Sequence, residues 1–242
     1  MNTTLRNQVA VVTGASSGIG RAIAQALAAH GAILSLVGRN RTKLDATRDA
    51  LPQGSTAHTH VCDFVESNDI SALASEITRA HTHIDILVHC AATIAMGPIE
   101  TAPIADLDRQ FHTNLRAPYL LTQLLLPLLK KASGQIAFIN SSIALRGKEG
   151  VAAYCATKHA LKGLADTLRL EVNSHGVRVL SVFAGNTDTP MQHEIHEHIG
   201  KKYDSSTMLQ PSDIASMLVT ALALPRSAEV TDIHIRPMHS ST

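Results

Sequence analysis

Tryptophan is absent from this chain, and aromatic residues make up only 3% of its 242 residues. A buried core must therefore be built mainly from Ala, Leu, Ile and Val, which favours helices packed closely against a sheet. Cysteine is also scarce. Cys62, Cys90 and Cys155 are odd in number and show no CxxC spacing, which argues against a disulfide framework and predicts reduced thiols in a cytoplasmic protein.

Neither sign of charge is in excess. The formal net charge is +1, and the basic residues are scattered along the chain, which argues against nucleic acid or an anionic membrane as a partner. No apolar run reaches membrane-spanning length, and the first expected strand begins at about Gln8, which leaves no room for a signal peptide. We expect a soluble, cytoplasmic protein that acts on a small molecule.

Apolar, β-branched runs alternate with stretches of helical spacing over almost the whole chain. The expected strands are Val9–Thr13, Ile33–Val37, Ala57–Cys62, Ile84–Cys90, Gln135–Asn140, Val177–Phe183 and Asp232–Ile235. The expected helices are Ile19–His30, Ser67–His81, Asp106–Lys131, Val151–Ser174 and Ser212–Leu224. This alternation predicts parallel strands joined by right-handed crossovers. The expected fold class is α/β: a single Rossmann-type doubly wound domain over residues 1–242, with about seven parallel strands and helices on both faces.

A glycine-rich segment joins the first expected strand to the first expected helix. Its candidate cofactor-binding residues are Gly14, Ser16, Ser17, Gly18, Ile19 and Gly20. Glycines bring main-chain N–H groups close to a pyrophosphate, and the start of a helix adds partial positive charge. Such a loop alone can be a bare turn, but its place between a strand and a helix predicts a dinucleotide site. The Lys-Ser/Thr ending of a P-loop is missing, which argues against a kinase or an ATPase.

Two side chains near later strand ends are candidates for the adenosine part of the cofactor. Arg39 follows the second expected strand. A carboxylate at this position would bind the adenosine ribose hydroxyls and repel a 2′-phosphate, whereas the guanidinium of Arg39 can bind a phosphate. We therefore predict NADP(H) in preference to NAD(H), although Arg39 can also stack on adenine or face solvent. Asp63 is placed to accept the adenine amino group, or it is an acid at the start of a helix.

Tyr154 and Lys158 lie four residues apart in an expected helix and so share one face. A tyrosine has a pKa near ~10, and a nearby cation is expected to lower it by about 1–3 units, which makes the phenol a usable acid or base. Taken alone, the pair also fits two ordinary surface residues.

Six features in order identify the chain as similar to the short-chain dehydrogenase/reductase family, from about Gln8 to about Pro237. They are the TGASSGIG loop, Asp63, Asn114, the NSS run at 140–142, the YCATK run at 154–158 and the AGNTDT run at 184–189. The resemblance implies an NAD(P)(H)-dependent oxidoreductase that interconverts a carbonyl and a secondary alcohol by hydride transfer. It implies that Tyr154 exchanges the proton, and that Lys158 binds the nicotinamide ribose and lowers the pKa of Tyr154.

The same resemblance assigns further site residues. The family's catalytic serine lies thirteen residues before the tyrosine, which selects Ser141 over Ser142. Asn114 is assigned a water-holding role, and Pro118, four residues on, has no N–H to give its carbonyl. A simple proline kink is the alternative. The resemblance also implies cofactor contacts from Ala91, Tyr154, Lys158, Gly185, Thr187 and Thr189.

The chain departs from the family pattern at two places. His89-Cys90-Ala91-Ala92 stands where the family has Asn-Asn-Ala-Gly, and Ala184 stands where it has proline. These differences put the fine geometry of the cofactor site in doubt.

The segment at about 189–210 is expected to form a short lid over the substrate. It contains His193, His196 and His198, but Glu197 occupies the position where a metalloprotease helix needs its second histidine. We therefore expect no functional metal.

Two other functions remain open. A non-catalytic NADP(H)-sensing or scaffold protein would retain the fold without needing Asn114, Ser141, Tyr154 and Lys158 together. A sugar-nucleotide epimerase or dehydratase would need a longer substrate domain after residue 183. The resemblance also implies a homo-oligomer, a dimer or a tetramer, and we expect a homotetramer formed through the helices at 106–131 and 151–174.

Overall fold

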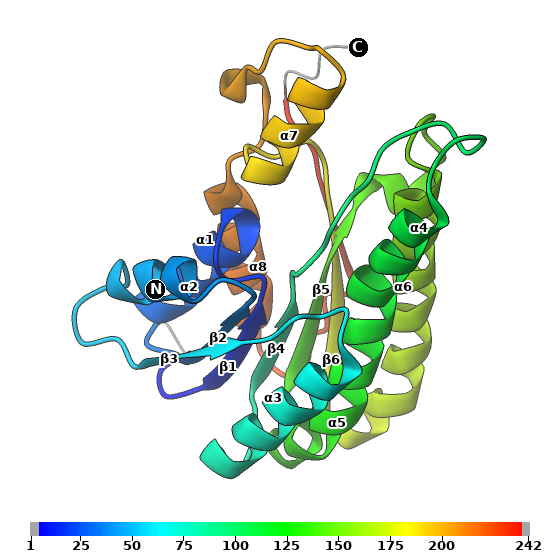
Figure 1. Cartoon of the computed structure of the whole chain (residues 1–242). Coiled ribbons are helices and arrows are strands. Elements are labelled where there is room, and N and C mark those ends of the chain that lie inside the picture. The colour runs from blue at the N-terminus through cyan, green and yellow to red at the C-terminus, as the bar shows by residue number, and fades with distance from the viewer. Residues whose placement is uncertain (1–4, 239–242) are drawn as a thin grey trace.

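The computed structural model describes residues 5–238; residues 1–4 and 239–242 of the predicted domain lie outside the described residues. Seven parallel strands form one sheet in the order β3-β2-β1-β4-β5-β6-β7 (Figure 1). The strands are β1 Val9–Thr13, β2 Ile33–Gly38, β3 Ala57–Val61, β4 Ile86–His89, β5 Gln135–Ser141, β6 Arg178–Ala184 and β7 Asp232–Ile235. The chain winds outward from β1 to β3 and then returns to β4, so the strand order reverses between β1 and β4. This is the predicted doubly wound arrangement.

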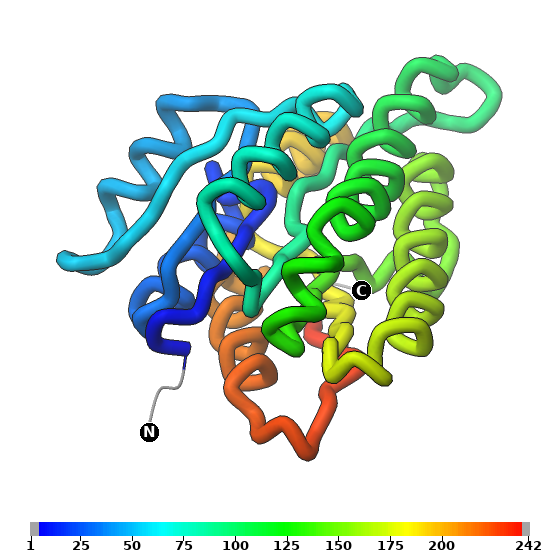
Figure 2. The backbone as a smooth tube through the Cα atoms, turned by 90° about the horizontal axis from the view of Figure 1, so that it is seen from below, coloured from blue at the N-terminus to red at the C-terminus, as the bar shows by residue number. Residues whose placement is uncertain are grey.

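Helices cover both faces of the sheet. They are α1 Gly18–Ala29, α2 Arg41–Asp49, α3 Ser67–Ala80, α4 Ile104–Phe111, α5 Ala117–Ala132, α6 Ala152–Val172, α7 Pro190–His198 and α8 Pro211–Leu222. Helices α1 and α8 pack together on one face, and α3, α5 and α6 lie along the other (Figures 1 and 2). Across residues 5–238, the longest apolar helical stretch falls short of what a membrane crossing requires.

Alternate residues of the central strands enter two separate cores. In β1, Val12 packs in the core beneath α1 and α8, whereas Val11 packs in the core beneath α3, α5 and α6. Both valines are fully buried. A strand covered on both faces has no polar side to show, which is why its sequence is a continuous apolar run.

Two helical segments differ from the sequence-based expectation. The helix expected at 106–131 is divided into α4, a π-helical turn at His112–Arg116, and α5, with Pro118 in the first turn of α5. Proline supplies no N–H to the preceding turn, and π turns of this kind often occur at functional sites. Helix α2 was not predicted because it is mostly polar. It begins at Arg41 and is capped by Asn40, whose side chain accepts a hydrogen bond of 2.9 Å from the backbone N–H of Lys43.

Candidate active site

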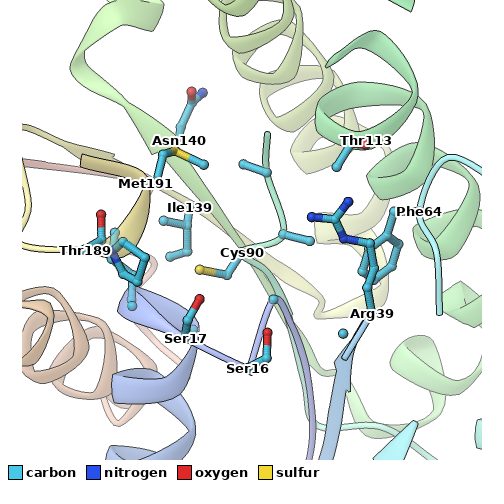
Figure 3. A pocket seen from close by; sticks show the side chains of 18 of the residues that line it. Ser16, Ser17, Arg39, Phe64, Cys90, Thr113, Ile139, Asn140, Thr189 and Met191 are labelled. Atoms are coloured by element: carbon cyan, nitrogen blue, oxygen red, sulfur yellow. The ribbon is translucent and has the colours of Figure 1, made fainter. Parts of the chain in front are cut away.

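Two cavities adjoin beyond the carboxyl ends of the strands. Of the predicted site residues, the first cavity is lined by Gly14, Ser16, Ser17, Gly18, Ile19, Gly20, Arg39, Asp63, Ala91, Tyr154, Lys158 and Thr189 (Figure 3). The second is lined by Ile19, Ser141, Tyr154, Gly185, Thr187 and Thr189. The structure therefore brings together every predicted site residue except Asn114, which lies behind the cavity walls.

The glycine loop packs too closely for side chains. Gly14 has a φ of 69°, and a Cβ on it would lie 2.8 Å from the backbone nitrogen of Ala91. A Cβ on Gly20 would clash with the carbonyl oxygen of Gly14. Ser17 is the N-cap of α1, yet its side chain makes no capping hydrogen bond, so first-turn N–H groups of α1 remain available to an anion. This cradle fits the pyrophosphate of a dinucleotide.

Thr13 is a positioning residue that the sequence did not single out. Its hydroxyl oxygen accepts hydrogen bonds from the backbone N–H groups of Cys90 (3.0 Å) and Ala91 (3.1 Å). It also donates to the carbonyl of Val88 at 3.3 Å. Thr13 thereby fixes the segment after β4 against the glycine loop. The only available signal was its position at the end of β1.

Arg39 and Asp63 lie at the adenosine end expected for a dinucleotide. The side chain of Arg39 is exposed and reaches from the end of β2 into the first cavity (Figure 3). Asp63 lines the same cavity, while one of its carboxylate oxygens accepts a hydrogen bond of 3.0 Å from the backbone N–H of Val65. Asp63 thus has a local turn role whatever it contacts in the cavity.

Ser141, Tyr154 and Lys158 meet where the two cavities join. Ser141 ends β5, and its side chain forms a hydrogen bond with the Tyr154 hydroxyl. Lys158 lies one turn further along α6, with its Nζ 5.7 Å from the centroid of the Tyr154 ring. The Nζ donates a hydrogen bond of 3.0 Å to the carbonyl of Ile139, which fixes the ammonium group in the wall of the first cavity.

Burial determines the ionisation of this pair. It raises the pKa of Tyr154 to about 12, against an opposing effect of the hydrogen bond with Ser141. It lowers the pKa of Lys158 to about 8. The direction for Tyr154 is opposite to our expectation from the sequence. The cause is that removing both groups from water disfavours their charged forms more than nearby groups favour them.

Asn114 lies outside the two cavities and joins two segments that line them. It lies on the π-helical turn and is buried. Its side-chain oxygen accepts from the backbone N–H of Thr93 at 2.8 Å, and its amide donates to the carbonyl of Thr93 at 2.9 Å and to Thr157 Oγ1 at 3.1 Å. Asn114 therefore joins the segment after β4 to the turn of α6 that precedes Lys158.

Two of the residues that depart from the family pattern, His89 and Cys90, are uncharged near neutral pH. His89 is buried, accepts or donates a hydrogen bond of 2.8 Å with Thr122 Oγ1, and stacks on Phe138. Burial lowers the pKa of His89 to about 3. Burial also raises the pKa of Cys90, which lines the first cavity, to about 12, so its sulfur is a thiol rather than a thiolate.

The expected lid contains helix α7 and lies beyond the strand ends (Figure 1). The rings of His193 and His196 contact the ring of Tyr203, with centroid distances of 4.6 and 5.3 Å. The Tyr203 hydroxyl donates a hydrogen bond of 2.5 Å to Asp188. The two histidines thus have a packing role, and residues 5–238 hold no group of three or more His, Cys, Asp or Glu arranged for a metal ion.

Comparisons with known proteins agree with this arrangement. A family model described as short chain dehydrogenase matches residues 8–200. An uncharacterized oxidoreductase of Staphylococcus epidermidis is 32% identical, over 97% of this chain and 99% of that protein. A sepiapterin reductase of Chlorobaculum tepidum is 32% identical, over 95% of this chain and 96% of that protein. The solved structure of a metagenomic short-chain oxidoreductase in complex with NADP is 33% identical, covers 98% of this chain and 99% of that one, and has a TM-score of 0.84.

Proposed function

The chain belongs to the short-chain dehydrogenase family, and on that premise we propose that it is an NADP(H)-dependent oxidoreductase that interconverts a carbonyl and a secondary alcohol. One observation carries the proposal. Lys158 faces the first cavity, Ser141 faces the second, and Tyr154 faces both. A proton donor is thus available at the boundary between a cofactor cavity and a substrate cavity, as general acid–base catalysis requires.

The first cavity is the cofactor site. The glycine loop and the start of α1 hold the pyrophosphate, Lys158 binds the nicotinamide ribose, and Asp63, Ala91 and Thr189 add further contacts in this cavity. Gly185 and Thr187, which line the second cavity, complete the contacts from that side. When bound, the nicotinamide supplies or accepts the hydride. Arg39 extends into this cavity and favours a 2′-phosphate, and the metagenomic relative was solved with NADP.

Tyr154 acts as the general acid in carbonyl reduction. A phenol with a pKa of about 12 stays protonated at neutral pH and therefore has its proton ready to give. The hydroxyl of Ser141 donates to the substrate oxygen beside it.

Asn114 acts as a positioning residue for proton supply. Its side chain is already bonded to Thr93 and Thr157, so any water must be held by its main-chain carbonyl. Pro118 gives no N–H to that carbonyl. We propose that the main-chain carbonyl of Asn114 binds a water molecule that passes protons toward Lys158.

The protein acts as a single catalytic domain with residues 189–210 as its substrate lid, in the cytoplasm and as a homotetramer. Large apolar side chains on α4 and α6 support association. Ile104 is 70% exposed and Leu170 is 82% exposed, and contact with a second copy would remove both from water.

The experiment that tests the function measures consumption of NADPH and NADH over a panel of ketones and aldehydes, with Tyr154→Phe alongside. We expect turnover with NADPH and a loss of about 10²–10⁴-fold in kcat for the variant, because it keeps the ring but loses the proton. NADPH binding by the variant, measured by titration, should remain. Failure to bind either nucleotide contradicts the proposal, and nucleotide binding without any turnover supports the non-catalytic sensor instead.

A further inference from the structure

The loop between the two catalytic side chains presents cations to the substrate cavity. Ser141 ends β5, a short turn follows, and residues 146–151 then lead to α6 and Tyr154. Arg146 and Lys148 in this loop line the second cavity together with Ser141 and Tyr154. Neither cation lines the first cavity, so neither is placed to hold the cofactor.

Nothing in the described cavity neutralises these cations. None of the described residues that line it is Asp or Glu. Within residues 5–238, neither side chain forms a hydrogen bond or an ion pair with another residue. Cationic side chains without counter-charges create a positive potential in a cleft, which draws anions to it.

The loop is fixed in relation to the proton donor. The carbonyl of Arg146 accepts a contact of 3.7 Å from the Sγ of Cys155, the residue after Tyr154. The backbone N–H of Gly97 donates a hydrogen bond of 2.9 Å to the carbonyl of Gly150, which joins the loop to the segment after β4. The cations are therefore held at a defined place rather than on a free strand of chain.

Apolar side chains form part of the wall, beside polar ones such as Asn186 and Gln192. Ile94, Met96, Ile143 and Val151 line this cavity, and Met191 and Ile195 of α7 cover it. A ligand in this cavity therefore has a proton donor, apolar side chains and two cations among the groups around it.

We propose that the substrate is a carbonyl compound with an apolar body and an anionic group, a carboxylate or a phosphate, held by Arg146 and Lys148. The inference rests on the proposed function. Guanidinium and ammonium groups both bind these anions, and the guanidinium can do so through two hydrogen bonds. The reaction remains the two-electron reduction of the carbonyl to an alcohol, with the nicotinamide oxidised and one proton consumed. The anion orients the substrate and takes no part in the chemistry.

The first test measures binding and needs no turnover. Hexanoate, hexyl phosphate and uncharged hexanamide are titrated calorimetrically into the protein saturated with NADP at low salt. We expect the better of the two anions to bind about fivefold more tightly than hexanamide, since an exposed ion pair contributes up to about 1 kcal/mol. The comparison of hexanoate with hexyl phosphate identifies which anion the site takes. In the double variant Arg146→Gln/Lys148→Gln this preference should disappear. Lys201→Gln, which removes one charge from an exposed position outside the cavity, is the control and should retain it.

The second test measures selectivity in turnover. Oxo acids are each paired with their methyl esters, and the ratio of kcat/KM for acid and ester is compared between the wild type and the double variant. We expect the ratio to fall about fivefold or more, and to fall with added salt in the wild type because exposed charges are screened.

The outcomes separate this inference from the proposed function. Equal binding of anions and hexanamide, or a preference that survives in the double variant, overturns the inference. Reduction of uncharged ketones with no preference for oxo acids overturns the inference and leaves the oxidoreductase intact. Anion binding as expected, with no carbonyl reduced, supports the anion site and contradicts the proposed reaction.

Discussion

We propose that the choice between NADP(H) and NAD(H) depends on Arg39. It is exposed and reaches into the first cavity from the end of β2. We expect Arg39→Ala to weaken NADPH binding about 5- to 10-fold and to leave NADH binding almost unchanged, because only NADPH has the 2′-phosphate that the guanidinium would bind. Fluorescence titration of both nucleotides measures the effect.

Arg41 offers a matched control on the same side of the sheet. Its guanidinium already donates to the carbonyl and the hydroxyl of Thr59, and it does not line the cavity. Arg41→Ala should therefore leave both dissociation constants close to the wild-type values. Equal weakening of NADPH and NADH by Arg39→Ala would indicate that Arg39 stacks on adenine, and no change in either would place it in solvent.

His89 makes stability depend on pH. Its pKa is lowered to about 3 by burial in the folded protein, whereas an unfolded histidine has a pKa near ~6.5. Between these values only the unfolded chain takes up the proton, so the stability present above about pH 6.5 is lost as pH falls toward 3. From pH 7 to pH 5 we expect His89 alone to cost about 2 kcal/mol. Urea unfolding at the two pH values measures this loss.

His89→Gln keeps a hydrogen-bonding group near Thr122 without a titrating ring. The fall in unfolding free energy between pH 7 and pH 5 should be about 2 kcal/mol smaller in this variant than in the wild type. His175→Gln, at an exposed position, is the control and should show the wild-type fall. The explanation fails if both variants show the same pH dependence.

Tyr203 joins the proposed lid at 189–210 to Asp188 at its base. Its hydroxyl donates to Asp188, and backbone hydrogen bonds join Asp188 and Asn186 to Leu209 at the other end of the lid. We expect Tyr203→Phe to let the lid open more often, because a hydrogen bond to a charged group contributes roughly 1.5–3 kcal/mol when formed in the folded protein. Because this hydrogen bond is partly exposed to solvent, we expect the equilibrium constant for opening to rise only about 3- to 10-fold.

Limited proteolysis measures this opening directly. Lys201 and Lys202 precede Tyr203 and are exposed, so trypsin cleavage there reports how often the segment leaves its folded position. Tyr203→Phe should be cleaved about 3- to 10-fold faster than the wild type. Tyr119→Phe removes an exposed phenol from α5 and is the control. Equal cleavage rates in all three proteins would show that the Tyr203 hydroxyl does not restrain opening of this segment.

Elements whose pattern depends on burial could be predicted from the sequence. The glycine loop can be recognised in the sequence because there is no space for a Cβ on Gly14 or Gly20. The strands can be recognised as continuous apolar runs because both of their faces are covered. Helix α2 could not be predicted because only Leu44 and Thr47 of its residues are buried, so its apolar period is too weak. The π-helical turn was also missed, since a proline predicts a kink but not its form.

The site was less predictable than the elements, because its properties depend on contacts across the chain. The spacing of Tyr154 and Lys158 predicts that they share a face, but not that burial outweighs attraction in setting both of their pKa values. The placement of Arg146 and Lys148 in the second cavity depends on how residues 146–151 are fixed to Gly97 and Cys155. No local pattern in the sequence encodes those contacts.

Helix α6 connects the active site to the outer surface. Tyr154 and Lys158 lie near its start, and Leu170, near its end, is 82% exposed. On the neighbouring helix α4, Ile104 is 70% exposed and Phe111 is 46% exposed. Helices α4 and α6 pack against each other, and we propose that together they form the surface that a second copy covers. Burial of this side against a second copy would also stabilise the helix that carries the proton donor.

We therefore predict that the wild type is a homo-oligomer, a tetramer in its complete form, at micromolar concentration. Phe111→Glu/Leu170→Glu should shift it toward smaller species and weaken association by at least about 10-fold, because two carboxylates would have to lose their water at the interface. Met217→Glu, on the exposed side of α8, is the control and should keep the wild-type mass. Light scattering coupled to size-exclusion chromatography measures all three masses. A wild-type mass of one chain contradicts the prediction, and dissociation by Met217→Glu instead would move the interface to α8.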